Sequence, residues 1–216
     1  MNEGTVGQRV AAQIDQEVLA RLQALETVAQ RVAPFMRGDG AALQKFLVDR
    51  EVFHKQFNAG VFVTGLDGTV IASTPVGAGR AGNNFIDSDA VATALKENKA
   101  SIGRPVDARQ FQAPSITMVT PIRDAQGRVI GALAGLSDLG RPNFLDAIAG
   151  HRYGKTGGYV LISPRHKLVV TATDKRLSMM PTRSTEPLAI RFREGYEGSG
   201  VFTNPFGVEM LSSAKR

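Results

Sequence analysis

Apolar residues recur at helical spacing through the first part of the chain. Between Val6 and Met36 they fall three or four positions apart, at Val10, Ile14, Val18, Leu22, Leu25, Ala29 and Val32. This spacing predicts a long amphipathic helix that ends at the glycine-flanked turn Arg37–Gly40. So broad a stripe favours packing on the helix's own domain, and its steps of three and four from Val18 onward also fit a parallel coiled-coil partner. A second helical pattern, ALQKFLVDREVFHKQF, follows the turn.

Two later stretches share an alternating pattern of apolar and polar residues. GVFVTGLDGTVIASTP (Gly60–Pro75) and GYVLISPRHKLVVTATD (Gly158–Asp174) each begin with a glycine, break at a polar turn and resume as a β-branched strand. In the first stretch, Leu66-Asp67-Gly68 supplies the positive φ angle that a tight turn needs. The pattern therefore predicts two β-hairpins, which begin two copies of one module.

The segments that follow each hairpin extend the two copies. After the first hairpin come a helical stretch and two long strands, SITMVTPI and RVIGALAGL, joined by RDAQG. Antiparallel strands with helices packed on one side predict an α+β fold. A further hairpin is predicted around Asn204–Gly207, after the second one. The second copy is therefore smaller than the first, and the final strand expected after this hairpin is absent from the sequence. Between the copies, LGRPNFLDAIAGHRYGKTG predicts a short helix and a linker.

These patterns divide the chain into three parts. We expect a long N-terminal helix with its lead-in over residues 1–58, a first module over 59–140, and a second module over 141–216 that is truncated at its C-terminus. The 43% hydrophobic content of the 216 residues is ample for packed cores. The N-terminal stretch holds no apolar core of signal-peptide type, and no run reaches the roughly 18 apolar residues of a membrane span.

The amino-acid composition limits the kinds of functional site that the chain can hold. The chain has no cysteine, which excludes disulfides, thiolate nucleophiles and cysteine-ligated metal sites. Its formal net charge is +6. The basic residues form no dense run, and no aromatic residues are interleaved with them to form a platform for bases. This distribution favours a solvated basic surface over a nucleic-acid interface.

The motif GAGRAG, Gly77–Gly82, matches the G-x-G-x-x-G pattern of dinucleotide sites. Such a site needs a hydrophobic helix directly after the glycines, within a parallel β-α-β unit. Here NNFIDSD follows, and the preceding strand is the return arm of a hairpin. We therefore expect a mobile glycine loop and no bound cofactor.

Catalytic and metal-binding patterns are missing from the sequence. The three histidines, His54, His151 and His166, lie in different segments, and none has the short spacing to carboxylates of a metal site. No serine lies in a Gly-x-Ser-x-Gly context. We expect neither a metal site nor an enzyme, and a hydrolase or transferase with an unfamiliar site is the remaining catalytic alternative.

Polar residues concentrate around the strands of the first module, between FIDSD and AGLSDL. Arginine can bind a carboxylate through two parallel hydrogen bonds, and an aspartate at the end of a strand can receive an ammonium group. We therefore predict a small-molecule site on a concave face of the first sheet. Its predicted residues are Phe85, Asp87, Asp89, Arg104, Asp107, Arg109, Ser115, Thr117 and Asp138.

The order of these elements resembles a known family. A long N-terminal helix precedes two PAS-like modules, and the first module contains GRPV, a long strand and TPIRDAQGRVIGALAGLSDL (Thr120–Leu139). Together with GKTGGYVLIS at the start of the second module, this order resembles the double Cache (dCache) sensor domains. They are extracytoplasmic ligand-binding regions of bacterial membrane receptors, and the resemblance covers nearly the whole chain.

The resemblance implies a membrane-distal module that binds a small molecule and a membrane-proximal module that relays the change. It places the chain on the periplasmic side of an inner-membrane protein, with flanking transmembrane helices outside this sequence. The outputs of such receptors are chemotaxis signalling, histidine kinase or diguanylate cyclase domains. A homodimer through the N-terminal helix is a further expectation.

The resemblance also bears on single residues. Asp138 falls where the amino-acid-binding members keep an aspartate for the ligand's amino group. Where those members show Arg-x-Trp-Tyr, this chain has Asp87-Ser88-Asp89-Ala90, and Val106 stands where a tyrosine usually follows the proline. We expect a carboxylate or an amine as the ligand, the carboxylate because of Arg104 and Arg109. The alternative is a structural dimerisation module that binds no ligand.

Overall fold

The computed structural model describes residues 3–38, 40–108, 113–146, 155–182, 185–204 and 206–215. The chain divides into two compact units. One comprises Val18–Asn143, and the other comprises Met1–Glu17 together with Phe144–Arg216. The division of the sequence into parts at residues 58 and 140 stays a prediction.

The predicted N-terminal helix is confirmed as α1 (Glu3–Val32), which contributes residues to both units. The chain continues as the 3₁₀ helix η1 (Ala33–Arg37), because Pro34 at its start has no N–H to donate to a further α-helical turn. Within the Val18–Asn143 unit, the apolar stripe of α1 is buried at Leu25, Val28, Ala29 and Val32. The second helical pattern forms two helices rather than one, α2 (Gly40–Val48) and α3 (Glu51–Gln56).

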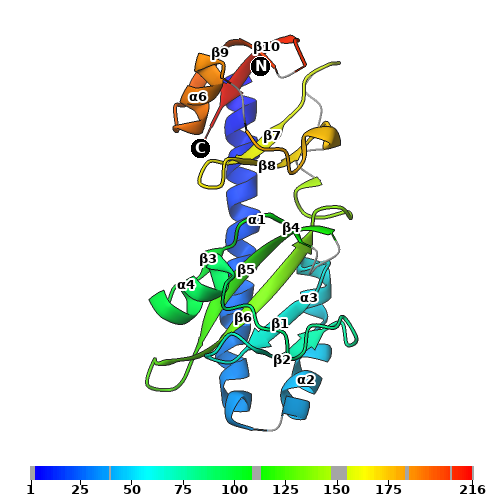
Figure 1. Ribbon diagram of the computed structural model, residues 1–216, viewed down its shortest axis with the longest axis vertical. Helices are drawn as coiled ribbons and strands as arrows, with labels where there is room; N and C mark the ends of the chain where they lie inside the picture. Colours follow the sequence, from blue (N-terminus) through cyan, green and yellow to red (C-terminus); the bar gives the residue numbers. More distant parts are fainter. Residues whose placement is uncertain are drawn as a thin grey trace. The chain divides into compact units, whose positions relative to one another are not determined.

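The Val18–Asn143 unit is built on an antiparallel sheet (Figure 1). The strand order is β2-β1-β6-β5-β3, and β4 also pairs with β5. Both hairpins predicted for the first module are confirmed, β1 with β2 and β5 with β6. Gly68 has a φ of +83° in the first turn, as that prediction requires. The strands are β1 (Val61–Thr64), β2 (Val70–Thr74), β3 (Ser101–Ile102), β4 (Val106–Ala108), β5 (Ala113–Arg123) and β6 (Val129–Asp138).

Helix α4 (Asp89–Glu97) covers one face of this sheet, which we call the α4 face. Its Ala90, Val91 and Ala94 pack against side chains from the sheet and from the loop before the helix. The rings of Phe62 and Phe85 stack there with their centroids 4.9 Å apart. The sheet residues in this core are Phe62, Val70, Val119, Ala132, Ala134 and Leu136.

The opposite face of the sheet packs against the helical lead-in. A Cβ on Gly135 of β6 would lie 2.5 Å from the ring of Phe57, which follows α3 and is 1% exposed. A Cβ on Gly131 would lie 2.5 Å from the Cε of Met36 in η1. Glycine is required at both positions, because the Phe57 ring lies against Gly135 and the carbonyl oxygen of Thr64 in β1 lies 2.3 Å from the Cβ position of Gly131.

The edge strand β2 is covered by α2. The side-chain amide of Gln44 accepts a hydrogen bond from the Ser73 N–H (3.0 Å) and donates one to the Ser73 carbonyl (2.8 Å). This pair of bonds imitates a neighbouring strand, so it satisfies backbone groups that an open sheet edge would otherwise leave unpaired.

The second unit contains two separate two-stranded sheets. The hairpin predicted over Gly158–Asp174 is confirmed as β7 (Val160–Ser163) with β8 (Leu168–Ala172). The hairpin around Asn204–Gly207 is confirmed as β9 (Gly198–Thr203) with β10 (Glu209–Ala214). Between them lie the 3₁₀ helix η2 (Lys175–Leu177) and α6 (Pro187–Arg193). The short helix predicted between the copies falls largely on residues 147–154, outside the described residues.

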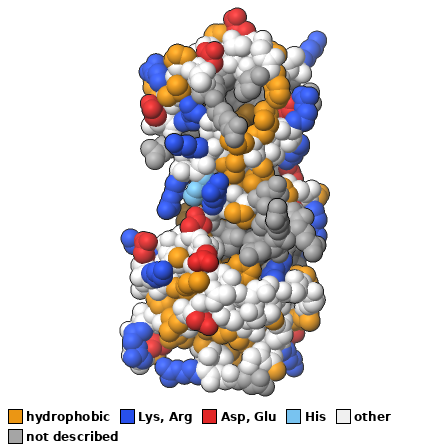
Figure 2. All heavy atoms as spheres, in the orientation of Figure 1, with side chains coloured by type: hydrophobic (Ala, Val, Ile, Leu, Met, Phe, Trp, Pro, Cys, Tyr) orange, Lys and Arg blue, Asp and Glu red, His pale blue; other side chains and the backbone are white. Residues whose placement is uncertain are grey.

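Among the described residues, no helix combines the length and the apolar character needed to span a bilayer. Figure 2 shows Lys and Arg side chains dispersed over the visible surface and interspersed with Asp and Glu. On this face the two signs of charge are mixed, and the solvated basic surface expected from the sequence stays a prediction.

We predict that Gly135→Ala destabilises the Val18–Asn143 unit by about 1–3 kcal/mol, because the new methyl group overlaps the buried Phe57 ring. Urea unfolding, monitored by circular dichroism, measures the change in the free energy of unfolding. Gly38→Ala is the control, since Gly38 has a φ of −108° and the nearest atom to its Cβ position is 3.8 Å away. Equal unfolding midpoints for the two variants would contradict this packing.

Candidate ligand-binding site

Strand register places three of the predicted site residues on one face of the sheet. Ser115 pairs with Asp138, and Thr117 pairs with Leu136. Cross-strand partners point to the same face, and side chains two positions apart along a strand do so as well. Since Leu136 packs in the core beneath α4, Ser115, Thr117 and Asp138 all lie on the α4 face.

These three polar residues are nearly inaccessible to water. Their exposed fractions are 1% for Ser115, 7% for Thr117 and 9% for Asp138. A buried charge is costly unless other groups neutralise it and donate hydrogen bonds to it. The contacts of Asp138 are therefore the central feature of this end of the sheet.

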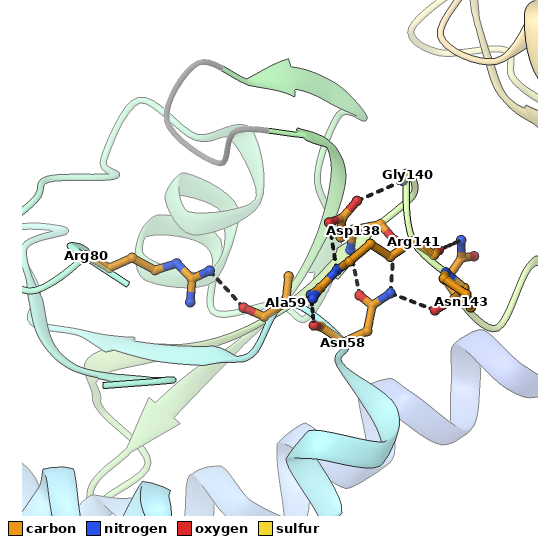
Figure 3. Close-up of polar contacts among 8 residues, drawn as sticks. Asn58, Ala59, Arg80, Asp138, Gly140, Arg141 and Asn143 are labelled. Atoms are coloured by element: carbon orange, nitrogen blue, oxygen red, sulfur yellow. Dashed lines mark hydrogen bonds and ion pairs between the residues drawn. The ribbon is translucent and has the colours of Figure 1, made fainter. Parts of the chain in front are cut away.

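The Asp138 carboxylate is bound by the segment that follows β6 (Figure 3). Oδ1 accepts a hydrogen bond from the Gly140 N–H (2.7 Å), and Oδ2 accepts one from Arg141 Nε (3.0 Å). The Arg141 guanidinium also donates through Nη2 to the carbonyl of Asn58. The Arg141 side chain is 58% exposed, whereas that of Asp138 is 13% exposed.

Asn58 holds the backbone of Asp138. Its Oδ1 accepts from the Asp138 N–H (2.7 Å), and its Nδ2 donates to the carbonyls of Asp138 (3.0 Å) and Pro142 (2.9 Å). Asn58 lies two residues after the end of α3, so it connects the helical lead-in to the end of β6 (Figure 3).

Asp89 and Arg104 meet through the backbone rather than through an ion pair. The Asp89 carboxylate accepts from the Arg104 N–H at 3.1 and 3.2 Å, and its Oδ1 also accepts from the Ala90 N–H (2.8 Å). The Gly103 N–H donates to the Thr117 carbonyl (2.7 Å). Asp89 therefore links the segment between β3 and β4 to the start of α4. Arg104 itself is exposed.

The remaining predicted residues lie elsewhere or cannot be placed. Phe85 is a core residue on the α4 face, stacked on Phe62. Asp87 is exposed in the turn before α4. The backbone of Asp107 belongs to β4, but its side chain and the whole of Arg109 lie outside what the structure describes. The assignment of all nine residues to a ligand stays a prediction.

The glycine loop Gly77–Gly82 is organised around Arg80. Gly77, Gly79 and Gly82 have positive φ angles, and Arg80 donates to the carbonyl of Thr74 (2.9 Å). Arg80 also donates to the carbonyl of Ala59 (2.8 Å; Figure 3). Burial lowers the pKa of the Arg80 guanidinium from its ordinary value. These hydrogen bonds attach the loop to Thr74 at the end of β2 and to Ala59 ahead of β1, and the mobility expected from the sequence stays a prediction.

No group of three His, Asp or Glu side chains within the described residues is arranged to hold a metal ion. Asn58 and Arg141 were not among the predicted site residues. The spacing of Asp138 and Arg141, three positions apart, was a weak local signal, since Arg141 lies in the stretch LGRPNFLDAIAGHRYGKTG that predicts a short helix and a linker. Asn58 gave none, since it lies 80 residues from Asp138 in sequence.

We predict that Asn58→Ala lowers the stability of the Val18–Asn143 unit by about 1–3 kcal/mol, because it leaves the Asp138 N–H without its acceptor. Thermal unfolding measures the loss. Asn83→Ala is the control. It removes one exposed hydrogen bond, from the side-chain amide of Asn83 to the Gly79 carbonyl, and should change the free energy of unfolding by about 0.5 kcal/mol or less. A similar loss in both variants would show that the Asn58 contacts contribute nothing specific.

Comparison with protein-family models gives no match, and comparison with curated protein sequences gives none. Solved structures, in contrast, share the fold. The ligand-binding domain of the Pseudomonas aeruginosa PAO1 amino acid chemoreceptor PctB, in complex with L-Gln, superposes with a TM-score of 0.74 at 17% identity. The match covers 96% of this chain and 80% of that one.

Two further structures extend the comparison. The sensor domain of the V. cholerae histidine kinase DctB gives a TM-score of 0.66 at 14% identity, over 89% of this chain and 74% of that one. An extracellular ligand binding receptor from Desulfohalobium retbaense gives 0.69 at 13% identity over 91% of this chain, which spans 35% of that receptor. The predicted α+β fold is confirmed, and it is the fold of bacterial ligand-binding and sensor domains.

Proposed function

We propose that this chain is the extracytoplasmic sensing domain of a transmembrane signalling receptor, and that its Val18–Asn143 unit binds a small molecule at Asp138. One observation carries the proposal. A buried carboxylate lies on the same face as two buried hydroxyl side chains, and its counterion is a half-exposed arginine from the following loop. Buried polar groups that converge at the end of a sheet are typical of a site that recognises a polar ligand.

The fold supports this proposal by analogy. PctB binds an amino acid, and DctB is a histidine kinase with a sensor domain. By the same analogy the chain lies in the periplasm, and flanking membrane helices connect it to a chemotaxis, kinase or cyclase output. We propose a binding module and not an enzyme, because the described part of the chain brings no nucleophile, base and oxyanion donors together at Asp138.

The contacts of Asn58 suggest how occupancy of the site reaches α1. Arg21 of α1 is 8% exposed and donates through Nε to the Gln56 carbonyl (3.2 Å), two residues before Asn58. Gln56–Asn58 thus contacts α1 at one end and Asp138 at the other. A ligand that favours one arrangement of this segment shifts the population of α1 positions by its difference in affinity.

A thermal unfolding panel tests the proposal. We expect one class among amino acids, mono- and dicarboxylates, amines, purines and pyrimidines to raise the midpoint. A ligand at about a hundred times its dissociation constant adds roughly 2.7 kcal/mol, which raises the midpoint by about 5 to 10 °C in a chain of this size. Asp138→Asn should remove the shift, because Asp138 anchors either the ligand or its arginine partner.

Asp124→Asn is the matched control. Asp124 lies at the opposite end of the same hairpin, and it too accepts hydrogen bonds from backbone N–H groups and from an arginine, Arg128. The ligand shift should persist in this variant. Equal shifts in wild type and in Asp138→Asn would locate binding elsewhere.

The competing function is a structural dimerisation module. Leu19 on α1 is 55% exposed, so this helix has apolar surface to offer a second copy. No midpoint shift across the panel, together with a dimer in sedimentation velocity, would favour that function over sensing.

A further inference from the structure

We propose that Arg141 determines ligand specificity and selects a carboxylate. This inference rests on the proposed function, since it names the class of molecule that the same site takes. In it Arg141 contacts the ligand, and Asp138 acts as a positioning residue that holds the guanidinium in place.

The Asp138 carboxylate is already neutralised within the chain. Gly140 N–H occupies Oδ1, and Arg141 Nε occupies Oδ2. A ligand ammonium would have to share this carboxylate with a guanidinium that already neutralises its charge and that the carbonyl of Asn58 also holds. Competition of this kind weakens the binding of any amine at Asp138.

The Arg141 guanidinium has hydrogen-bond donors that no described residue uses. A guanidinium carries five N–H groups in a planar fork. Among the described residues, Arg141 uses Nε for Asp138 and one Nη2 hydrogen for Asn58, and Nη1 has no partner there. The side chain is 58% exposed, so a ligand can reach the unused donors. A carboxylate matches this geometry because it accepts two parallel hydrogen bonds.

The other end of the hairpin provides an internal comparison. Arg128 directs both Nε (2.9 Å) and Nη2 (2.8 Å) at Asp124 Oδ2. Arg141, in contrast, divides its donors between a carboxylate and a backbone carbonyl. Arg141 also contacts the acid that pairs across the strands with the buried Ser115, whereas Asp124 lies in the turn after Arg123. Of these two aspartates, Asp138 is therefore the one that register places directly across from a buried hydroxyl side chain.

Calorimetric titration with charge-matched probes tests the inference. The probes are acetate, lactate and succinate as carboxylates, succinamide as the neutral analogue of succinate, and 1,4-diaminobutane as the amine. We expect wild type to bind at least one carboxylate and to ignore succinamide and the amine. Arg141→Gln should weaken carboxylate binding about 10- to 100-fold, the range for hydrogen bonds to a charged group.

Three further variants separate a ligand contact from a structural role. Arg141→Lys should retain part of the affinity, because it keeps the charge and loses the fork. Arg128→Gln should bind like wild type. In Arg141→Gln the freed Asp138 carboxylate should gain affinity for 1,4-diaminobutane, a reversal of selectivity that a merely destabilised loop would not produce.

Two results would overturn the inference and leave sensing intact. They are binding of the amine by wild type in preference to every carboxylate, and carboxylate binding by Arg141→Gln at wild-type affinity. A lack of response to these probes and to the whole thermal panel contradicts the proposed function itself, and the inference with it.

Discussion

The end of strand β6 depends on one side-chain amide. Asn58 accepts from the N–H of Asp138 and donates to its carbonyl, so it provides the hydrogen bonds that a neighbouring strand would otherwise supply. Gln44 does the same for Ser73 at the edge strand β2. The bonds of Asn58 hold the Asp138 backbone in place, and they bring the Asn58 carbonyl within reach of Arg141.

Side chains alternate between the two faces of the sheet, so one face packs against the helical lead-in and the other carries the candidate site. On one face of β6, Gly135 lies against the Phe57 ring and admits no side chain. On the other face, the apolar residues Ala132, Ala134 and Leu136 are followed by Asp138 at the strand's end, and Ser115 and Thr117 accompany it on β5. A rigid core directly beneath polar side chains suits a binding site, because side chains fixed by packing lose little entropy when a ligand binds.

Local patterns were sufficient to predict the long N-terminal helix and the hairpins. Alternation and turn glycines such as Gly68 predicted the hairpins, and helical spacing predicted α1. The hairpin of β5 and β6 was predicted from two adjacent long strands and a short turn, whereas the register that pairs Ser115 with Asp138 is seen only in the structure. The break between α2 and α3 at Asp49 and Arg50 was missed, because the apolar spacing continues across it.

The missed parts of the candidate site share a physical cause. Asn58 and Arg141 act through hydrogen bonds that join residues 80 or more positions apart, and no local periodicity reports such contacts. Arg80 was read as part of a glycine loop, although its guanidinium holds carbonyls at Ala59 and Thr74. Single polar side chains that bond to distant backbone become visible only when the chain is folded.

Hydrogen–deuterium exchange tests the central claim most directly, with the compound that gives the largest shift in unfolding midpoint. Binding at Asp138 predicts slower exchange at the amides of Gly103, Asp138 and Gly140, together with a change in α1 around Arg21. Protection confined to Phe144–Arg216, or spread evenly over the chain, would contradict a site at the end of β6.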